Sequence, residues 1–147
     1  MLTICTIGYT KKSLERFVGL LQDAGVDAVI DIRLRNTSQL AGFAKRDDLA
    51  FLLRKGFSIE YEHLPELAPP PELLDAYKAD GDWPAYERAF LPLLTERDAL
   101  ALGRQIMARY RNPCLLCSEP TPEHCHRRLV AEWWAARLPD VEVVHLL

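Results

Sequence analysis

Residues 28–32 read Ala-Val-Ile-Asp-Ile, a run that is almost continuously apolar and carries one charge, Asp31, near its end. Strands that are buried on both faces of a parallel sheet have this pattern. Four further strands are predicted at residues 2–7, 57–64, 114–117 and 141–146. We therefore expect a mostly parallel sheet of about five strands.

Segments with helical periodicity separate these strands. They lie at residues 14–24, 47–55, 95–110 and 122–138, with Ser13 and Thr121 as expected N-caps of the first and last. Strands that alternate with helices form βαβ units whose sheet is covered on both faces. The sequence thus predicts a single three-layer α/β domain over residues 1–147. The prolines from Pro65 to Pro71 interrupt the alternation and predict a small helical insertion at about residues 68–95.

Composition narrows the class of protein. The chain has 147 residues, with 18 Lys and Arg against 21 Asp and Glu, and a formal net charge of −3. A strongly basic nucleic-acid-binding protein is therefore disfavoured. The first residues lack the features of a secretion signal, and no apolar run approaches the length of a membrane-spanning helix. We expect a cytoplasmic protein that has no contact with membranes and keeps its four cysteines reduced.

Titratable residues concentrate where the predicted strands end. In open parallel sheets, ligands bind at the carboxyl ends of the strands. The segments expected at this edge are residues 8–10, 31–33, 63–66 and 117–119, together with the helix start at 125–128. We expect these segments to surround one cavity, and His63 is the histidine that the third strand brings there.

The favoured interpretation of this edge is an anion site. The start of the last predicted helix offers free N–H groups, and Arg33, Arg127 and Arg128 are expected to bind a phosphate or carboxylate beside it. Gly8 allows the backbone to approach a ligand closely, and Tyr9 can stack on a base or sugar. No further glycine follows Gly8 in the pattern of a dinucleotide-binding fingerprint, and no Gly-Lys-Ser/Thr is present.

Two carboxylates are expected at the same edge, at the ends of different strands. Asp31 and Glu119 are candidates for proton transfer or for binding a ribose hydroxyl. The alternative is that Asp31 pairs with Arg127 or Arg128 in a network that only stabilises the fold. The sequence leaves both interpretations open.

Thiols and an imidazole form a further candidate group. Cys125 is predicted in the first turn of the last helix, where the helix N-terminus and neighbouring arginines lower the pKa of a thiol. It is therefore a candidate nucleophile, with His63, His124 or His126 as its base, and Cys117 and His126 are expected to line the floor of the site. The alternative is that Cys125 packs in the core.

The same residues permit a second alternative, a metal site. Cys117, Cys125 and His126 carry suitable donor atoms, and His63 or His124 could supply a fourth. Cys114 precedes Cys117 by three residues, but in a strand this spacing directs the two side chains to opposite faces, so we expect Cys114 in the core. Because the anion site is favoured, we assign no metal ligands and leave any cofactor unknown.

Several of these motifs resemble one protein family. The motifs are Thr6-Ile7-Gly8-Tyr9, Asp31-Ile32-Arg33, His63-Leu64-Pro65-Glu66-Leu67, Leu116-Cys117-Ser118-Glu119 and Cys125-His126-Arg127-Arg128. In this respect the chain resembles the family known as domain of unknown function 488, over about residues 3–145. The Cys-x-Glu and Cys-His-Arg block is the most specific part. The resemblance implies a small cytoplasmic α/β domain and brings no established reaction with it.

These observations lead to a ranked set of functional hypotheses. We expect an enzyme or enzyme-like domain, a hydrolase or group transferase, that binds a phosphate-bearing small molecule or nucleotide. A non-catalytic module for nucleic acid or a partner protein is the alternative, and a metal-binding or thiol-dependent enzyme is a further one. Trp83, Tyr77 and Tyr86 are expected to pack the insertion onto the domain, where it could serve as a lid. A homodimer contact is expected near Trp133 and Trp134.

Overall fold

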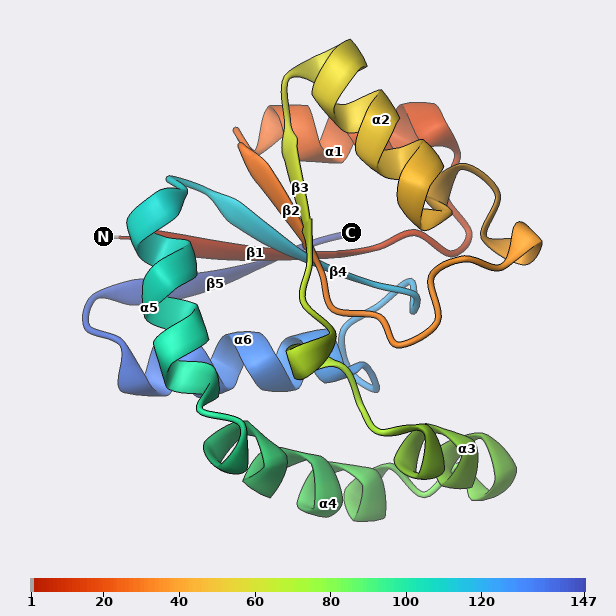
Figure 1. Ribbon diagram of the computed structural model, residues 1–147, viewed down its shortest axis with the longest axis vertical. Coiled ribbons are helices and arrows are strands. Elements are labelled where there is room, and N and C mark those ends of the chain that lie inside the picture. The colour runs from red at the N-terminus through yellow and green to blue at the C-terminus, as the bar shows by residue number, and fades with distance from the viewer. Residues whose placement is uncertain (1) are drawn as a thin grey trace.

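The strands lie side by side in one parallel sheet (Figure 1). A computed structural model describes residues 2–147. The strands in this part of the chain are β1 (Leu2–Gly8), β2 (Ala28–Asp31), β3 (Glu60–His63), β4 (Pro113–Cys117) and β5 (Val141–Leu146). Their order across the sheet is β3-β2-β4-β1-β5, and every neighbouring pair is parallel. The predicted α/β class and the five-stranded sheet are confirmed.

Helices cover both faces of the sheet and complete three layers. They are α1 (Leu14–Asp23), α2 (Arg46–Phe57), α3 (Pro71–Asp80), α4 (Trp83–Glu96), α5 (Ala99–Arg109) and α6 (His126–Arg137), with short 3-10 helices η1 (Gln39–Ala44) and η2 (Pro65–Leu67). Figure 1 shows α1 and α2 on one face, and α5 and α6 on the other with α3 and α4 beyond them. The α3–α4 pair is the helical insertion. Within residues 2–147, no helix combines the length and apolar character needed to cross a membrane.

The alternation of side chains along the strands divides the core into two halves. Ile30 and Leu115 belong to the half that α4, α5 and α6 cover. Val29 and Leu116 belong to the half that α1 and α2 cover. Because successive residues of a strand point to opposite faces, Asp31 shares the α1–α2 side with Val29, whereas Cys117 shares the α6 side with Leu115.

Helix boundaries differ from the expected ones at several places. The helix expected at residues 95–110 begins at Ala99, because α4 occupies Thr95 and Glu96. Helix α2 continues through Gly56 and ends at Phe57, and its C-cap Ser58 adopts the left-handed conformation. Helix α4 contains Pro92 and continues to Glu96; Pro92 is exposed, so water can satisfy the carbonyl whose hydrogen bond the proline removes. Helix α6 begins at His126 because the chain before it forms turns and Cys125 is extended.

Gly8 offers a test of how tightly β1 and the loop after β4 pack together. It pairs with Cys117 in the sheet, and a β-carbon on it would lie 1.6 Å from the carbonyl oxygen of Glu119. We predict that Gly8→Ala lowers the free energy of unfolding by about 2 kcal/mol or more, because the backbone must move to admit the methyl group. Chemical denaturation of the purified variant measures this change.

Gly19 provides the matched control. It lies inside α1, and a β-carbon there would meet nothing within 4 Å. Gly19→Ala should therefore raise the free energy of unfolding by about 0.5–1 kcal/mol. If Gly8→Ala unfolded at the same denaturant concentration as the wild type, the close packing of Gly8 against Glu119 would be wrong.

Candidate functional site

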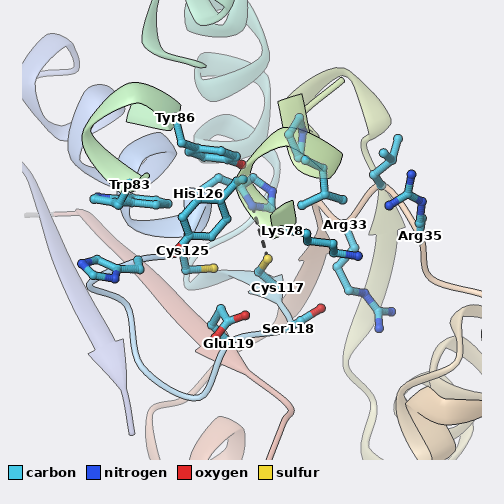
Figure 2. A pocket seen from close by; sticks show the side chains of 15 residues that line it. Arg33, Arg35, Lys78, Trp83, Tyr86, Cys117, Ser118, Glu119, Cys125 and His126 are labelled. Atoms are coloured by element: carbon cyan, nitrogen blue, oxygen red, sulfur yellow. Dashed lines mark hydrogen bonds between the residues drawn. The ribbon is translucent and has the colours of Figure 1, made fainter. Parts of the chain in front are cut away.

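A pocket of about 220 Å³ lies where β4 ends, between the insertion and the loop that follows β2. Its lining comes from three parts of the chain: residues 33–35, residues 69–86 and residues 117–126. The sulfur atoms of Cys117 and Cys125 lie between the rings of Trp83 and Tyr86 on one side and Arg33 on the other (Figure 2). The pocket therefore lies at the carboxyl edge of the sheet, where the strand pattern places a ligand.

Cys117, Cys125 and His126 form a buried cluster in this pocket. Their ligand atoms all lie within 4.8 Å of one another. Cys117 is the last residue of β4, Cys125 is the N-cap of α6 and His126 is the first residue of that helix. Strand, loop and helix thus bring together three residues that are nine positions apart at most in the sequence.

The orientation of the His126 ring follows from its two contacts. Nε2 lies 2.7 Å from the carbonyl oxygen of Ile32, which can only accept, so Nε2 carries the proton and donates it. In the neutral ring the lone pair is then on Nδ1, which lies 3.3 Å from Sγ of Cys117. The Ile32 carbonyl therefore selects the tautomer in which Nδ1 can accept a proton from Cys117 or bind a cation.

The two thiols of the cluster differ in their tendency to ionise. A hydrogen bond from Cys125 lowers the pKa of Cys117; burial opposes this shift, and the Ser118 N–H and the charge of Arg127 add to it. Burial raises the pKa of Cys125 well above its usual value, and the neighbouring Cys117 raises it further. If one of the two is a thiolate at neutral pH, it is Cys117, whereas the sequence had pointed to Cys125.

Aromatic side chains form one wall of the pocket, here called the aromatic wall: Tyr77, Trp83, Tyr86 and His124. Trp83 stacks on Tyr86 with ring centroids 4.9 Å apart and on His124 with centroids 5.3 Å apart. Tyr77 packs against Tyr86 at 5.2 Å. The expectation that these residues pack the insertion down holds for the buried Trp83 and Tyr86, which also line the pocket.

Three cationic residues, Arg33, Arg35 and Lys78, also line the pocket and are here called the cationic wall. Arg33 is buried, and its guanidinium lies over the ring of Tyr9, 5.3 Å from the centroid. Its Nη1 atom is buried without a hydrogen-bond partner among the described residues. Arg35 is half exposed and pairs with Asp75 at the surface. Two of these residues, Arg35 and Lys78, were absent from the predicted site.

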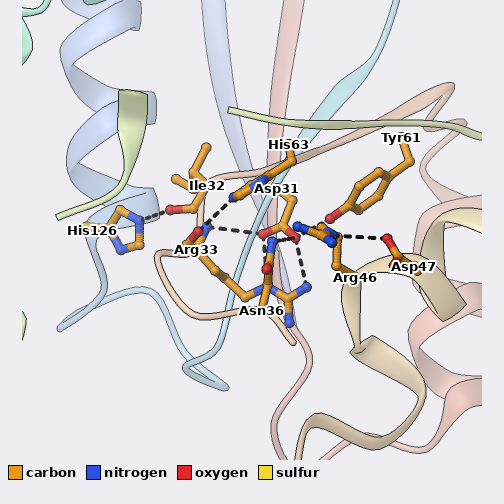
Figure 3. A network of polar contacts seen from close by, with 9 residues as sticks. All are labelled: Asp31, Ile32, Arg33, Asn36, Arg46, Asp47, Tyr61, His63 and His126. Carbon is orange, nitrogen blue, oxygen red and sulfur yellow. Dashed lines mark hydrogen bonds and ion pairs between the residues drawn. The ribbon is translucent and has the colours of Figure 1, made fainter. Parts of the chain in front are cut away.

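Asp31 lies outside this pocket, in a polar network on the α1–α2 side of the sheet (Figure 3). Its carboxylate accepts two side-chain hydrogen bonds from Arg33, from Nε and Nη2, each at 2.8 Å. Asn36 donates to the same carboxylate at 3.1 Å, and the Tyr61 hydroxyl makes a further short contact. Asp31 has no exposed surface, its oxygens are hydrogen-bonded, and its partner is Arg33 in place of the expected Arg127 or Arg128.

Burial and hydrogen bonding compete for the pKa of Asp31. Burial alone would raise it, but the hydrogen bonds and the charge of Arg33, with a hydrogen bond from Tyr61, lower the pKa below its usual value. The pKa of Tyr61 shifts in the opposite direction: burial and the nearby Asp31 carboxylate raise it. The network is therefore an ionised carboxylate surrounded by donors.

The two arginines of α6 take different positions. Arg127 is fully buried; its Nε donates to Thr6 at 3.2 Å, and its Nη1 donates to the carbonyl of Glu119 at 2.6 Å. Arg128 forms ion pairs with Glu87 and Glu132. Neither arginine lines the pocket, so they do not converge with Arg33 on one ligand there.

The remaining predicted residues support the site from outside. Gly8 packs against the loop after β4, and Tyr9 lies under Arg33. His63 Nε2 donates to the carbonyl of Arg33 at 3.1 Å. Glu119 does line the pocket, together with Cys117, Cys125 and His126. Arg33, Glu119 and the cluster therefore line one pocket, and Asp31 lies outside it.

Five residues of the two walls were absent from the predicted site: Arg35, Tyr77, Lys78, Trp83 and Tyr86. Trp83 and Tyr86 were assigned to packing because their spacing is that of a helix face. The available signal was the position of the insertion, which follows the carboxyl end of β3 and so returns over the ligand-binding edge.

Comparison with known proteins places the chain in a family. The family model described as "Domain of unknown function DUF488" matches residues 13–134. The chain belongs to this family. The match spans most of the chain and confirms the resemblance inferred from the motifs. The description of the DUF488 family names no reaction. No match was found among curated proteins or among solved structures.

The Asp31 network makes a prediction about stability. Asp31→Asn leaves the buried Arg33 guanidinium without its counter-charge, and breaking a buried pair in this way costs about 3–5 kcal/mol. In the wild type, a carboxyl whose pKa is lowered by folding contributes stability above its unfolded pKa of about 3.9 and loses it as the pH falls toward the folded pKa. The variant should lack this part of the pH dependence.

Denaturation of the wild type and of Asp31→Asn between pH 2.5 and pH 7 measures both effects. Asp75→Asn is the matched control, since it removes an exposed partner of Arg35 and should change the free energy of unfolding by less than about 1 kcal/mol. Equal stability losses in the two variants would contradict the structural role of Asp31.

Proposed function

We propose that this protein is an enzyme or enzyme-like domain that binds a small phosphate-bearing molecule, such as a nucleotide, in the pocket at the end of β4. The observation that carries the proposal is that a cationic wall and an aromatic wall line the same pocket. A phosphate group suits the first and a flat ring suits the second. We further propose that the protein works in the cytoplasm, to which its four free thiols are suited.

The charges around the pocket favour an anion. Arg33, Arg35 and Lys78 line it together with the carboxylate of Glu119, and Arg33 and Arg35 also pair with Asp31 and Asp75 behind and beside the pocket. Three cationic side chains thus meet at one pocket in a chain whose net charge is −3. A local field of this kind draws an anionic ligand to the site.

The aromatic wall favours a ligand that carries a planar group. Trp83 stacks on both Tyr86 and His124, with interplanar angles of 16° and 23°. Side chains that hold one another in this way lose little further freedom when a ring packs against them. A nucleobase or a similar heterocycle matches this wall.

The Cys117–Cys125–His126 cluster is the reason for proposing chemistry and not only binding. It lines the pocket that the two walls enclose. A buried imidazole whose Nδ1 lies 3.3 Å from a thiol of lowered pKa is a reactive arrangement. Hydrolysis or group transfer at a phosphate-bearing substrate is the class of reaction that we propose.

Thermal unfolding with a panel of ligands tests the proposal. AMP, ATP, adenosine and inorganic phosphate separate the contributions of the base and of the phosphate. A ligand at about 100 times its Kd should add about 2.7 kcal/mol of stability. For a chain of this length this raises Tm by about 5–10 °C. We expect the nucleotides to give the largest increase.

Variants of exposed cations locate the binding. Lys78→Ala and Arg35→Ala should each reduce the nucleotide-dependent increase in Tm, because each removes positive charge from the pocket. Lys55→Ala is the matched control, since Lys55 is an exposed lysine of α2, on the other face of the sheet. The proposal fails if no phosphate-bearing compound raises Tm, or if the increase survives in the double variant of Lys78 and Arg35.

A further inference from the structure

We propose that Cys117, Cys125 and His126 bind a zinc ion or a similar divalent cation that keeps one coordination position open to the pocket. The proposed role of the ion in the pocket rests on the proposed function. The three ligand atoms are buried and lie within 4.8 Å of one another.

The distances and the donor types suit a tetrahedral zinc ion. Zinc binds cysteine sulfur at about 2.3 Å and histidine nitrogen at about 2.0–2.1 Å, so tetrahedral ligand atoms are about 3.5–4 Å apart. Sγ of Cys117 lies 3.3 Å from Nδ1 of His126, and Cys125 completes the group within 4.8 Å. Two sulfurs and one imidazole favour zinc over magnesium or calcium, which prefer oxygen ligands.

The second contact of His126 is an independent indication. A histidine that binds a metal through one ring nitrogen almost always donates the other N–H to a carbonyl or carboxylate. His126 donates from Nε2 to the Ile32 carbonyl at 2.7 Å, which leaves the Nδ1 lone pair directed to the side of Cys117. The ring is thus held, before any ion binds, in the tautomer that ligation requires.

The other cysteines and histidines near the site do not complete a closed set of four ligands. His63 donates to the Arg33 carbonyl, and His124 stacks on Trp83. Cys5 and Cys114 belong to the half of the core on the α1–α2 side. Among residues 2–147, the cluster therefore contains three protein ligands. Three ligands and a position left for water or substrate are typical of catalytic zinc sites, whereas structural sites have four.

The surroundings of the open position fit the proposed substrate. All three ligands line the pocket that also contains Glu119 and the cationic wall. A zinc ion there would act as a Lewis acid on a phosphoryl oxygen or lower the pKa of a bound water. Lys78, an exposed cation that lines the same pocket, would hold the remaining charge of the phosphate.

Metal content tests the assignment. The full chain, purified without chelators and supplied with zinc, should hold about one zinc ion per chain by mass spectrometry of the metal. Cobalt in its place should give the thiolate charge-transfer and visible bands of a tetrahedral site. Cys117→Ser, Cys125→Ser and His126→Gln should each lower the zinc affinity at least tenfold. His124→Gln, which changes a pocket histidine outside the cluster, should leave it unchanged.

A measurement on the wild-type protein tests the same assignment in case the variants do not fold. Zinc should protect Cys117 and Cys125 from alkylation by iodoacetamide, while the buried Cys5 and Cys114 serve as internal references. The assignment is overturned if no zinc binds, or if Cys117 is alkylated measurably and at the same rate with and without zinc.

The metal proposal and the nucleotide proposal can fail separately. The nucleotide-dependent increase in Tm is measured on chelator-treated and on zinc-loaded protein. An increase without any zinc binding overturns the metal site and leaves the proposed function. Zinc binding without any effect of phosphate-bearing compounds supports the metal site and overturns the proposed function.

Discussion

The buried carboxylate of Asp31 fixes the backbone on which the pocket depends. It has no exposed surface and accepts hydrogen bonds from Arg33, Asn36 and Tyr61. Removing two charges from water is costly, and the pair is tolerated because its geometry is bidentate and the remaining lone pairs are also satisfied. The same network holds the chain as it leaves β2, and so positions residues 32–35 beside the end of β4.

This arrangement links the two faces of the sheet. Asp31 and its partners lie on the α1–α2 side, whereas the carbonyl of Ile32, one residue later, accepts the hydrogen bond that orients His126 on the α6 side. Arg127 makes the corresponding link from α6 to β1, through Thr6 and the carbonyl of Glu119. Buried ion pairing and hydrogen bonding behind the pocket thus set the geometry of the Cys117–Cys125–His126 cluster within it.

The fold followed from the sequence because strand patterns are local: the run at residues 28–32 has apolar side chains on both faces and could only be an inner strand. The edge of the sheet at which the pocket lies was predicted from the same pattern.

Which residues face the pocket depends on how side chains alternate along each strand. This alternation places Asp31 and Cys117 on opposite faces of the sheet. The orientation of Cys125 could not be predicted, because the sequence places the start of the last helix at Pro122. The helix begins four residues later, at His126, so Cys125 is its N-cap and not part of its first turn. Lys78 could not be placed because the insertion folds back over the site only through tertiary packing.

The tautomer of His126 in the wild-type protein is the most direct measurement of whether the backbone after Asp31 orients the cluster. Nitrogen-15 NMR of the imidazole distinguishes the two ring nitrogens. The structure requires a proton on Nε2 that exchanges slowly because it is donated to Ile32, so that in the neutral ring the lone pair lies on Nδ1. A neutral ring whose proton lies on Nδ1, or one that exchanges between both tautomers, would contradict the account.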